Sequence, residues 1–401
     1  MLDIRFLREN PDLAKQRLAL RNPQFSSLID QILDCDAQRR QAETRYQQLQ
    51  AERKRLSKQI GQIRAAGGDS STLEEQARTL GEQIEALQKQ AAECDSRQRQ
   101  LLLITPNLPH EQIPVGSDSS ANPVVREYLT DHRKPTSPNH LEIASQLQLL
   151  DLDRAAKISG SGFTCFTHLG ARLERALINF LLDLHSQHHG YREISPPFLI
   201  RRDSMIGTGQ LPKFEEDMYA CEKDDLFLAP TAEVPLTNLY RDEILPISDL
   251  PIRLVAYSPC FRREAGSTGR ETRGIIRLHQ FDKVELVKIC RPEDSPAELE
   301  SLTNDAERVL QLLQIPYRVV ELCSGDLGFS SMRTYDIEVW SPGQAQFLEV
   351  SSCSNFGDYQ ARRMNLRFKD SDGKNRFCHT LNGSGTALPR LFVALIENHF
   401  Q

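Results

Sequence analysis

The chain has 401 residues, which allows two or three domains, and its content of 39% apolar and 26% charged residues is typical of a soluble globular protein. The formal net charge of −6 gives no general affinity for nucleic acid, so any such affinity would need a local basic patch. Nine scattered cysteines without a CxxC pair disfavour a disulfide framework or a zinc site. The N-terminal residues lack the apolar run of a signal peptide or membrane span, so we expect a cytoplasmic protein.

Residues 35–102 predict a helical hairpin. This segment is rich in Gln, Arg, Glu and Leu and contains no proline. Two series of residues at alternating spacings of three and four are separated by a Gly-Gly-Asp-Ser turn at residues 67–70, which predicts an antiparallel coiled coil. The seam positions are Tyr46, Leu49, Arg53, Leu56, Ile60 and Ile63, then Leu73, Ala77, Leu80, Ile84, Leu87, Ala91, Cys94, Gln98 and Leu101.

The two halves of this hairpin differ in charge. Residues 35–66 carry eight basic and three acidic side chains, whereas residues 73–99 carry four basic and six acidic ones. A basic helix in an acidic protein suggests contacts with phosphates, but the same charges would also suit the solvated face of a plain spacer. The arm alone leaves both interpretations open.

The composition changes after the hairpin. Prolines end the helix within Thr105-Pro106-Asn107-Leu108-Pro109, and residues 110–140 are rich in Pro, Ser, Asn and Asp. We therefore predict an N-terminal domain at residues 1–104, a linker at 105–140 and a C-terminal domain at 141–401.

The C-terminal domain mixes helices and strands. An amphipathic helix is predicted at residues 167–189, and strand-like runs occur at 253–258, 280–288, 334–340 and 346–352 without βαβ regularity. The predicted fold class is α+β, in which an antiparallel coiled-coil arm precedes a domain built on an antiparallel β-sheet with flanking helices.

The residues that could bind a phosphate or take part in catalysis are mostly cationic and lie beside glycines. No GxxxxGK[ST], HExxH or GxSxG motif occurs, so arginines would have to hold the phosphates of any ATP. Residues 258–285 read as strand, glycine-rich loop and strand, and Arg262 and Glu264 are expected on one face of the first strand. Arg390 follows a second glycine-rich stretch and precedes an apolar helix at residues 391–397.

These segments resemble a known family. Residues 261–285, FRREAGSTGRETRGIIRLHQFDKVE, are similar to motif 2 of the seryl branch of class II aminoacyl-tRNA synthetases, and TLNGSGTALPR at 380–390 is similar to motif 3. Residues 190–219 resemble motif 1 and the segment after it, APTAEVPLTNLY at 229–240 resembles the serine-binding TxE loop, and the N-terminal MLDIRFLRENPD resembles the family's opening. The resemblance covers essentially the whole chain.

The resemblance implies a serine–tRNA ligase with a class II catalytic domain, which activates L-serine with ATP and transfers it to the 3′ end of tRNA(Ser). It also implies Mg²⁺ as a cofactor and a homodimer formed through motif 1, and it leaves open whether tRNA(Sec) is a further substrate. One alternative is a catalytically inactive paralogue that serves as an RNA-binding module, against which the intact Arg262, Glu264, Glu349 and Arg390 argue. Another is a carrier-protein aminoacyl ligase, a class that lacks the long arm.

The family's site residues map onto this sequence as follows. The implied ATP-binding residues are Arg262, Arg263, Glu264, Phe281, Glu349, Val350, Ser351, Ser352 and Arg390, of which Arg262, Glu349 and Arg390 are catalytic and Glu349 and Ser352 hold the metal. The implied serine-binding residues are Thr231, Ala232, Glu233, Arg262, Glu285 and Ser384. The implied tRNA-binding residues are Arg45, Arg53, Lys54, Arg55 and Lys58 in the arm and Arg270 and Arg273 in the motif 2 loop.

Overall fold

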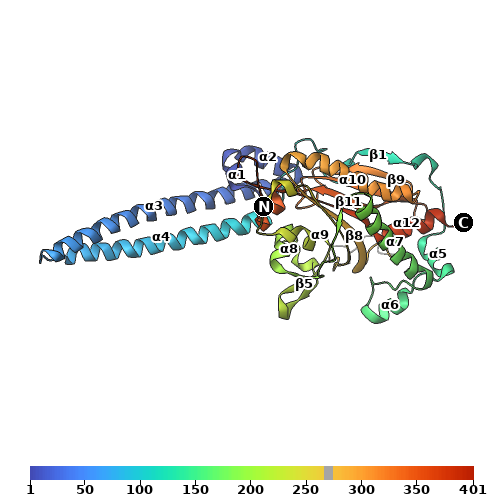
Figure 1. Ribbon diagram of the computed structural model, residues 1–401, viewed down its shortest axis with the longest axis horizontal. Helices are drawn as coiled ribbons and strands as arrows, with labels where there is room; N and C mark the ends of the chain where they lie inside the picture. The colour runs from blue at the N-terminus through green and yellow to red at the C-terminus, as the bar shows by residue number, and fades with distance from the viewer. Residues whose placement is uncertain (266–273) are drawn as a thin grey trace. The chain divides into compact units, whose positions relative to one another are not determined.

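The structure is a computed structural model that describes residues 1–265 and 274–401. It divides into two compact units, residues 2–105 and residues 106–401 with Met1 (Figure 1). All nine cysteines lie within the described ranges, and each is a free thiol. No helix in these ranges is both long and apolar enough to cross a membrane.

The first unit is entirely helical. Two short helices, α1 (Ile4–Glu9) and α2 (Pro11–Arg21), precede the two long helices α3 (Ser26–Ala65) and α4 (Ser71–Ile104). The long helices lie side by side as a hairpin (Figure 1), which confirms the predicted coiled-coil arm, although α3 begins earlier than residue 35.

The seam of the hairpin follows the predicted spacing. Leu49 and Leu56 of α3 and Ile84, Ala91 and Gln98 of α4 are buried. The interruption at Arg53 is accommodated by a small residue on the facing helix.

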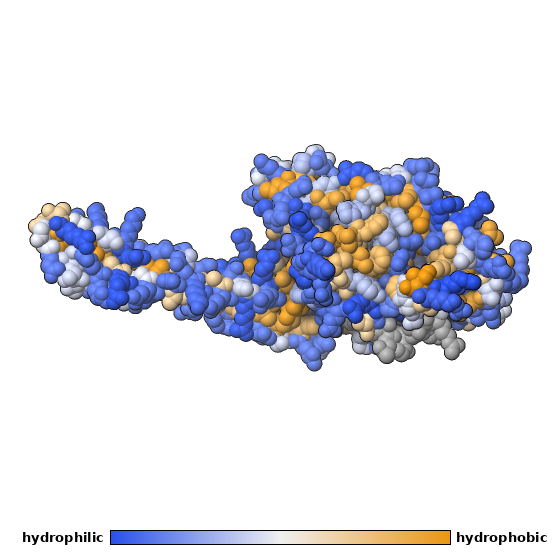
Figure 2. All heavy atoms as spheres, turned by 90° about the horizontal axis from the view of Figure 1, so that it is seen from below, coloured by the Kyte–Doolittle hydropathy of each residue, from blue (hydrophilic) through white to orange (hydrophobic). Residues whose placement is uncertain are grey.

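Arg53 itself is exposed, and its guanidinium lies over Gly81 of α4, where an added Cβ would stand 3.4 Å from Arg53 Cζ. Figure 2 shows that hydrophilic residues cover most of the visible surface of the arm.

The second unit is built on an eight-stranded sheet. All neighbouring strands are antiparallel except the β2–β7 pair, which is parallel. The strand order is β1 (Val124–Tyr128), β9 (Tyr317–Glu321), β10 (Arg333–Ser341), β11 (Gln346–Asn355), β14 (His379–Ala387), β8 (Gln280–Cys290), β7 (Ile252–Phe261) and β2 (Arg192–Glu193).

Part of the predicted linker belongs to this sheet. Within residues 105–140, strand β1 pairs with β9, and Tyr128 stacks on Tyr317 with ring centroids 5.3 Å apart. β-branched Val124 and Val125 suit a strand, but a two-valine signal between Pro- and Ser-rich stretches is too short to separate from a loop by sequence.

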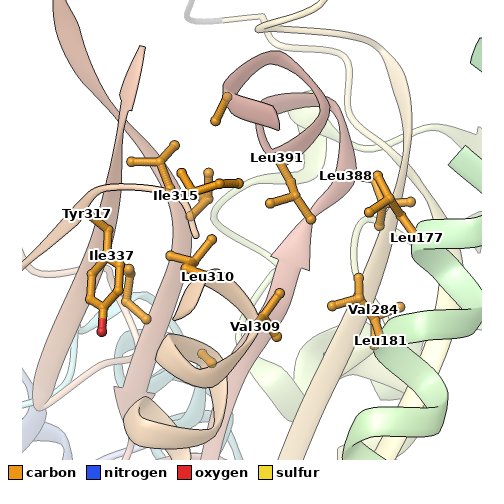
Figure 3. Packing of buried hydrophobic residues seen from close by; sticks show 14 of the residues in the cluster. Leu177, Leu181, Val284, Val309, Leu310, Ile315, Tyr317, Ile337, Leu388 and Leu391 are labelled. Atoms are coloured by element: carbon orange, nitrogen blue, oxygen red, sulfur yellow. The ribbon is translucent and has the colours of Figure 1, made fainter. Parts of the chain in front are cut away.

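Helices α7 (His168–Gln187), α10 (Ser295–Leu312) and α12 (Leu388–His399) pack on one face of the sheet. Leu177 and Leu181 of α7 lie against Val284 of β8, and residues of α10 and α12 fill the same core (Figure 3). Since side chains alternate along a strand, burial of Val284 and Leu286 in this core turns residues 281, 283 and 285 to the other face.

Smaller elements surround the sheet. The remaining α-helices of the described residues are α5 (His140–Leu147), α6 (Leu152–Ser159), α8 (Arg202–Thr208), α9 (Glu233–Thr237) and α11 (Tyr359–Met364). The two three-stranded sheets are β3 (Leu199–Arg201), β5 (Leu226–Leu228) and β4 (Ala220–Cys221), and β13 (Asn375–Phe377), β12 (Arg367–Lys369) and β6 (Ile244–Pro246).

Two β-bulges adjust which side chains face the site. Ile337 pairs with Ser351 and Glu338 with Glu349, so Val350 is an extra residue in β11. In β14, Ser384 pairs with Glu285 and Thr386 with Val284, so Gly385 is the extra residue. Each bulge reverses the alternation of the residues that follow it.

Candidate active site

A cavity of about 430 Å³ lies over the sheet face formed by residues 281, 283 and 285 of β8. It collects residues from both arginine-bearing segments, from the loop before α9 and from β11. The predicted site residues that line it are Thr231, Glu233, Arg262, Glu264, Phe281, Glu285, Glu349, Val350, Ser352, Ser384 and Arg390.

Arg390 enters the cavity from the first turn of α12. Pro389 precedes it within that turn, where the missing N–H costs no helical hydrogen bond. The guanidinium donates to Glu349 O (Nη1, 2.7 Å) and to Ile276 O (Nε, 3.3 Å), and Nη1 lies 3.5 Å from Glu349 Oε2. These contacts hold a planar cation at the cavity wall.

Arg262 supplies the second cation. Its Nε donates to Pro230 O at 3.2 Å, and its Cζ lies 5.3 Å from the centroid of the Phe281 ring. Arg262 forms no ion pair with a residue that the structure describes, so its charge is available to an anionic ligand.

The strand-based placement of Arg262 and Glu264 is wrong, because β7 ends at Phe261. Glu264 has a left-handed backbone with φ of 51°, and its Oε2 accepts from Arg277 Nη1 at 3.1 Å. Both side chains nevertheless line the cavity, since the loop rather than the strand directs them.

The floor of the cavity holds a buried polar cluster. Lys283 Nζ donates to Thr231 Oγ1 at 2.8 Å and forms an ion pair with Glu285. Thr231 Oγ1 lies 3.3 Å from Glu285 Oε2, and Asn382 Nδ2 donates to Glu285 Oε1 at 2.8 Å. Lys283 and Glu285 are both buried, so these contacts replace the water that the charges lose.

A second carboxylate, Glu233, lies at the start of α9 and is also buried. Gln360 Nε2 donates to Glu233 Oε1 at 2.7 Å. Burial raises the pKa of Glu233 to about 7, and the nearby charge of Glu285 acts in the same direction. Glu233 thus exchanges its proton near neutral pH.

Glu349 and Ser352 face the cavity together because of the bulge at Val350. Residues three apart on a regular strand would point to opposite faces. A carboxylate and a hydroxyl oxygen are ligands that suit a hard cation such as Mg²⁺. Asp336 is the cross-strand partner of Ser352, and burial together with the charge of Glu349 raises the pKa of Asp336 well above its usual range.

Some predicted residues do not place their side chains in this cavity. The guanidinium of Arg263 lies 5.9 Å from the Tyr219 ring centroid, and Ser351 donates to Ser384 O at 2.6 Å from within the core. Ala232 is fully buried in an apolar cluster behind the cavity. Arg270 and Arg273 lie outside the described residues.

The predicted basic residues of the arm fall into two groups. In α3, Arg39, Arg40 and Arg64 form ion pairs with acidic residues of the arm. The second group is Arg45, Arg53, Lys54, Arg55 and Lys58, which are exposed and form no ion pair with any described residue. Their charges therefore face solvent without local compensation.

Sequence reasoning missed several polar residues around the cavity, among them Arg277, Lys283 and Asn382 in its lining and Gln360, which donates to Glu233. Lys283 had a usable signal, because it stands midway between Phe281 and Glu285 and shares their face of β8. A lysine is usually solvent-exposed, so its residue type gave no reason to place it in a site.

Comparison with known proteins is consistent with this geometry. The model of the seryl-tRNA synthetase N-terminal domain matches residues 1–109, and that of the class II tRNA synthetase core domain (G, H, P, S and T) matches residues 214–399. The serine–tRNA ligase of Akkermansia muciniphila is 57% identical over 401 residues, which are 100% of this chain and 94% of that relative.

Solved structures of similar proteins agree with the family matches. The seryl-tRNA synthetase of Pyrococcus horikoshii, complexed with ATP, has a TM-score of 0.94 at 38% identity and matches over 100% of this chain and 95% of its own. The cytoplasmic serine–tRNA ligase of Naegleria fowleri, in complex with AMP, has a TM-score of 0.88 at 27% identity, with coverage of 100% and 94%. With matches to both of its parts and high identity over its full length, the chain belongs to the seryl-tRNA synthetase family.

Proposed function

We propose that this protein is an ATP-dependent serine–tRNA ligase, which forms seryl-adenylate and pyrophosphate and then transfers the seryl group to the 3′-terminal ribose hydroxyl of tRNA(Ser) with release of AMP. The observation that carries the proposal is a single cavity with Arg262 and Arg390 on its walls and a buried polar cluster around Glu233 and Glu285 on its floor. The family's solved relatives that contain ATP or AMP support the nucleotide assignment.

The first step is in-line attack of the serine carboxylate on the α-phosphorus of ATP, which breaks the bond to pyrophosphate. It requires no covalent intermediate with the enzyme, so positioning and charge neutralisation supply the rate enhancement. Arg262 binds the α-phosphate, Arg390 the γ-phosphate, and Phe281 stacks on adenine beside Glu264. A planar guanidinium matches two phosphate oxygens at once.

Serine lies deeper, at the polar floor. Glu233 and Glu285 accept from its ammonium and hydroxyl groups, and Ser384, the cross-strand partner of Glu285, closes this end of the cavity. Glu349 and Ser352 would hold Mg²⁺, which neutralises phosphate charge when bound. The bulge at Val350 supports this assignment, since it turns both oxygens to one face.

The arm provides the tRNA contacts through the unpaired cations of α3, and Arg270 and Arg273 contact the acceptor end. Recognition of an RNA helix through phosphates and shape suits such a surface. The protein functions in the cytoplasm as a homodimer formed through motif 1. Exposed Leu169 of α7 and the short edge strand β2 support that interface.

The deciding experiment is amino-acid-dependent ATP–pyrophosphate exchange by the purified protein, with serine, alanine and threonine in parallel. Exchange restricted to serine is expected, followed by charging of tRNA(Ser), with tRNA(Sec) as a second substrate in the same assay. Absence of exchange with every amino acid would contradict the proposal and favour an RNA-binding paralogue without activity.

A further inference from the structure

Lys283 is a buried ammonium group inside the cavity that binds the substrate. Its side chain is 7% exposed and that of Glu285 is 1% exposed. Charged groups are taken out of water only when ion pairs and hydrogen bonds compensate for the loss. The contacts of Lys283 therefore define what else it can bind.

The hydroxyl of Thr231 uses all of its hydrogen-bonding capacity within this cluster. Its hydroxyl accepts from Lys283 Nζ at 2.8 Å and from the Glu233 backbone N–H at 3.2 Å, and it donates to Glu285 Oε2 at 3.3 Å. A hydroxyl has one hydrogen to donate and two lone pairs. The Thr231 hydroxyl thus positions Lys283 and Glu285 and has no hydrogen-bonding capacity left for a substrate.

Lys283 and Glu285 each keep unused hydrogen-bonding capacity. The ammonium has three N–H groups and uses two, on Thr231 and Glu285. Glu285 Oε1 accepts a single hydrogen bond, from Asn382 at 2.8 Å, and can accept another. One donor and one acceptor therefore remain side by side on the cavity floor.

An alcohol matches this pair, because it accepts one hydrogen bond and donates another. We propose that Lys283 and Glu285 bind the side-chain hydroxyl of serine together, Lys283 donating to the hydroxyl oxygen and Glu285 accepting its hydrogen. Lys283 is then a specificity-determining residue. This inference rests on the proposed activation of serine.

Two consequences separate this arrangement from recognition by Glu285 alone. Alanine leaves both the donor and the acceptor without a partner, a loss that a site built for a hydroxyl converts into strong rejection. An amino acid whose side chain is an ammonium group meets Lys283 and is repelled, whereas a lone carboxylate would attract it.

The first test compares Lys283→Met with Lys288→Met. Lys288 is a matched control, since it is a fully buried lysine of the same strand but faces α10, where it pairs with Glu298 at 2.8 Å. Lys283→Met should raise the KM for serine about 10- to 100-fold, leave the KM for ATP within about twofold, and lower the ratio of serine to alanine activation. Lys288→Met should leave that ratio unchanged.

The second test uses the unmodified protein and so does not depend on the folding of a variant. L-2,3-diaminopropionate replaces the hydroxyl of serine by an ammonium group and competes with serine in pyrophosphate exchange. We expect it to bind more weakly than L-alanine, by about tenfold or more. Tighter binding than alanine would overturn the inference.

The outcomes also distinguish this inference from the proposed function. If the unmodified protein shows no serine-dependent exchange, the function itself fails. If serine exchange is normal and Lys283→Met retains the serine-to-alanine ratio, only the role of Lys283 is refuted.

Discussion

Single side chains in this cavity differ in role because their surroundings differ. Glu285 and Glu233 are two buried carboxyl groups in one cavity, yet Glu285 has a buried ammonium as its partner and Glu233 has an amide. The site therefore keeps one carboxylate ion-paired and leaves the other to exchange its proton near neutral pH.

This difference predicts a pH dependence. Burial raises the pKa of Glu233 from 4.5 to about 7, so the protonated folded form is favoured and the group destabilises the fold increasingly as pH rises from 4.5 to 7. In the proposed function Glu233 binds serine as a carboxylate, so kcat/KM for serine should rise through pH 7, and Glu233→Gln should lose that rise.

Glu174→Gln is the control for this prediction. Burial and the charge of Asp282 raise the pKa of Glu174 to about 8, but Glu174 does not line the cavity. The pH profile of Glu174→Gln should retain the rise in kcat/KM. If Glu233→Gln showed the same rise, the role of Glu233 would be contradicted.

A second residue-scale prediction concerns Arg390. Arg390→Gln removes a charged fork from the cavity wall, and loss of charged hydrogen bonds worth about 1.5–3 kcal/mol should lower kcat/KM for ATP roughly 10- to 150-fold. Arg376→Gln, which removes a half-exposed arginine paired with Glu293 and Asp370, is the matched control. Steady-state exchange kinetics would measure both, and equal values would argue against a phosphate contact at Arg390.

At the scale of elements, two things determine which side chains face the cavity. One is which segments form strands, and the other is the register in which the strands pair. The strands β7, β8, β10 and β11 were predictable because β-branched and aromatic residues recur in each of them. The extra residues Val350 and Gly385 were not, since a bulge is defined by pairing with a neighbouring strand. Sequence spacing alone would set Glu349 and Ser352 on opposite faces.

Dependence on contacts between distant segments also explains the other differences between the predicted and the observed elements. Arg262 and Glu264 were expected on a strand, but β7 ends one residue earlier, and the loop that follows depends on tertiary contacts. Strand β1 in the predicted linker is stabilised by β9, which is distant in sequence. The hairpin was predictable because its periodicity is local and long, although α3 begins at Ser26, before the predicted start.

The bulge in β14 gives an element-scale prediction. A Cβ added to Gly385 would lie 3.0 Å from His185 Nε2 and 3.3 Å from Val284 Cγ1. Gly385→Ala should therefore displace β14 beside Ser384, destabilise the fold by about 1–3 kcal/mol and raise the KM for serine.

Gly61→Ala is the control, because nothing lies within 4 Å of an added Cβ at that position in α3. This change should stabilise its helix by roughly 0.5–1 kcal/mol. Thermal unfolding and exchange kinetics would test the pair, and a wild-type melting temperature and KM for Gly385→Ala would contradict the expected displacement.

At the scale of the whole molecule, the proposed function assigns chemistry and nucleic-acid binding to different units. The cavity lies within residues 106–401, whereas the uncompensated cations belong to α3 of the other unit. A protein with a net charge of −6 can thus bind a polyanion through a local surface. Activation and charging should accordingly respond to different substitutions.

The combined variant Lys54→Gln, Arg55→Gln and Lys58→Gln tests this division. Its ATP–pyrophosphate exchange should match that of the unmodified protein, while its tRNA affinity falls. The slope of log affinity against log salt concentration should become shallower by about one for each of these cations that binds a phosphate. Lys89→Gln, Arg97→Gln and Arg99→Gln remove three exposed cations from α4 as the control. Equal tRNA affinities for the two variants would refute the assignment to α3.

The length of the hairpin can change only by whole repeats of its seam. Its helices rise about 1.5 Å per residue, and their seam repeats every seven residues, so one repeat corresponds to about 10 Å. Only insertions or deletions of whole repeats, made in both α3 and α4, keep Leu49, Leu56 and Ile84 on the seam. If the arm contacts tRNA as proposed, the distance that it spans along the RNA therefore changes in steps and not continuously.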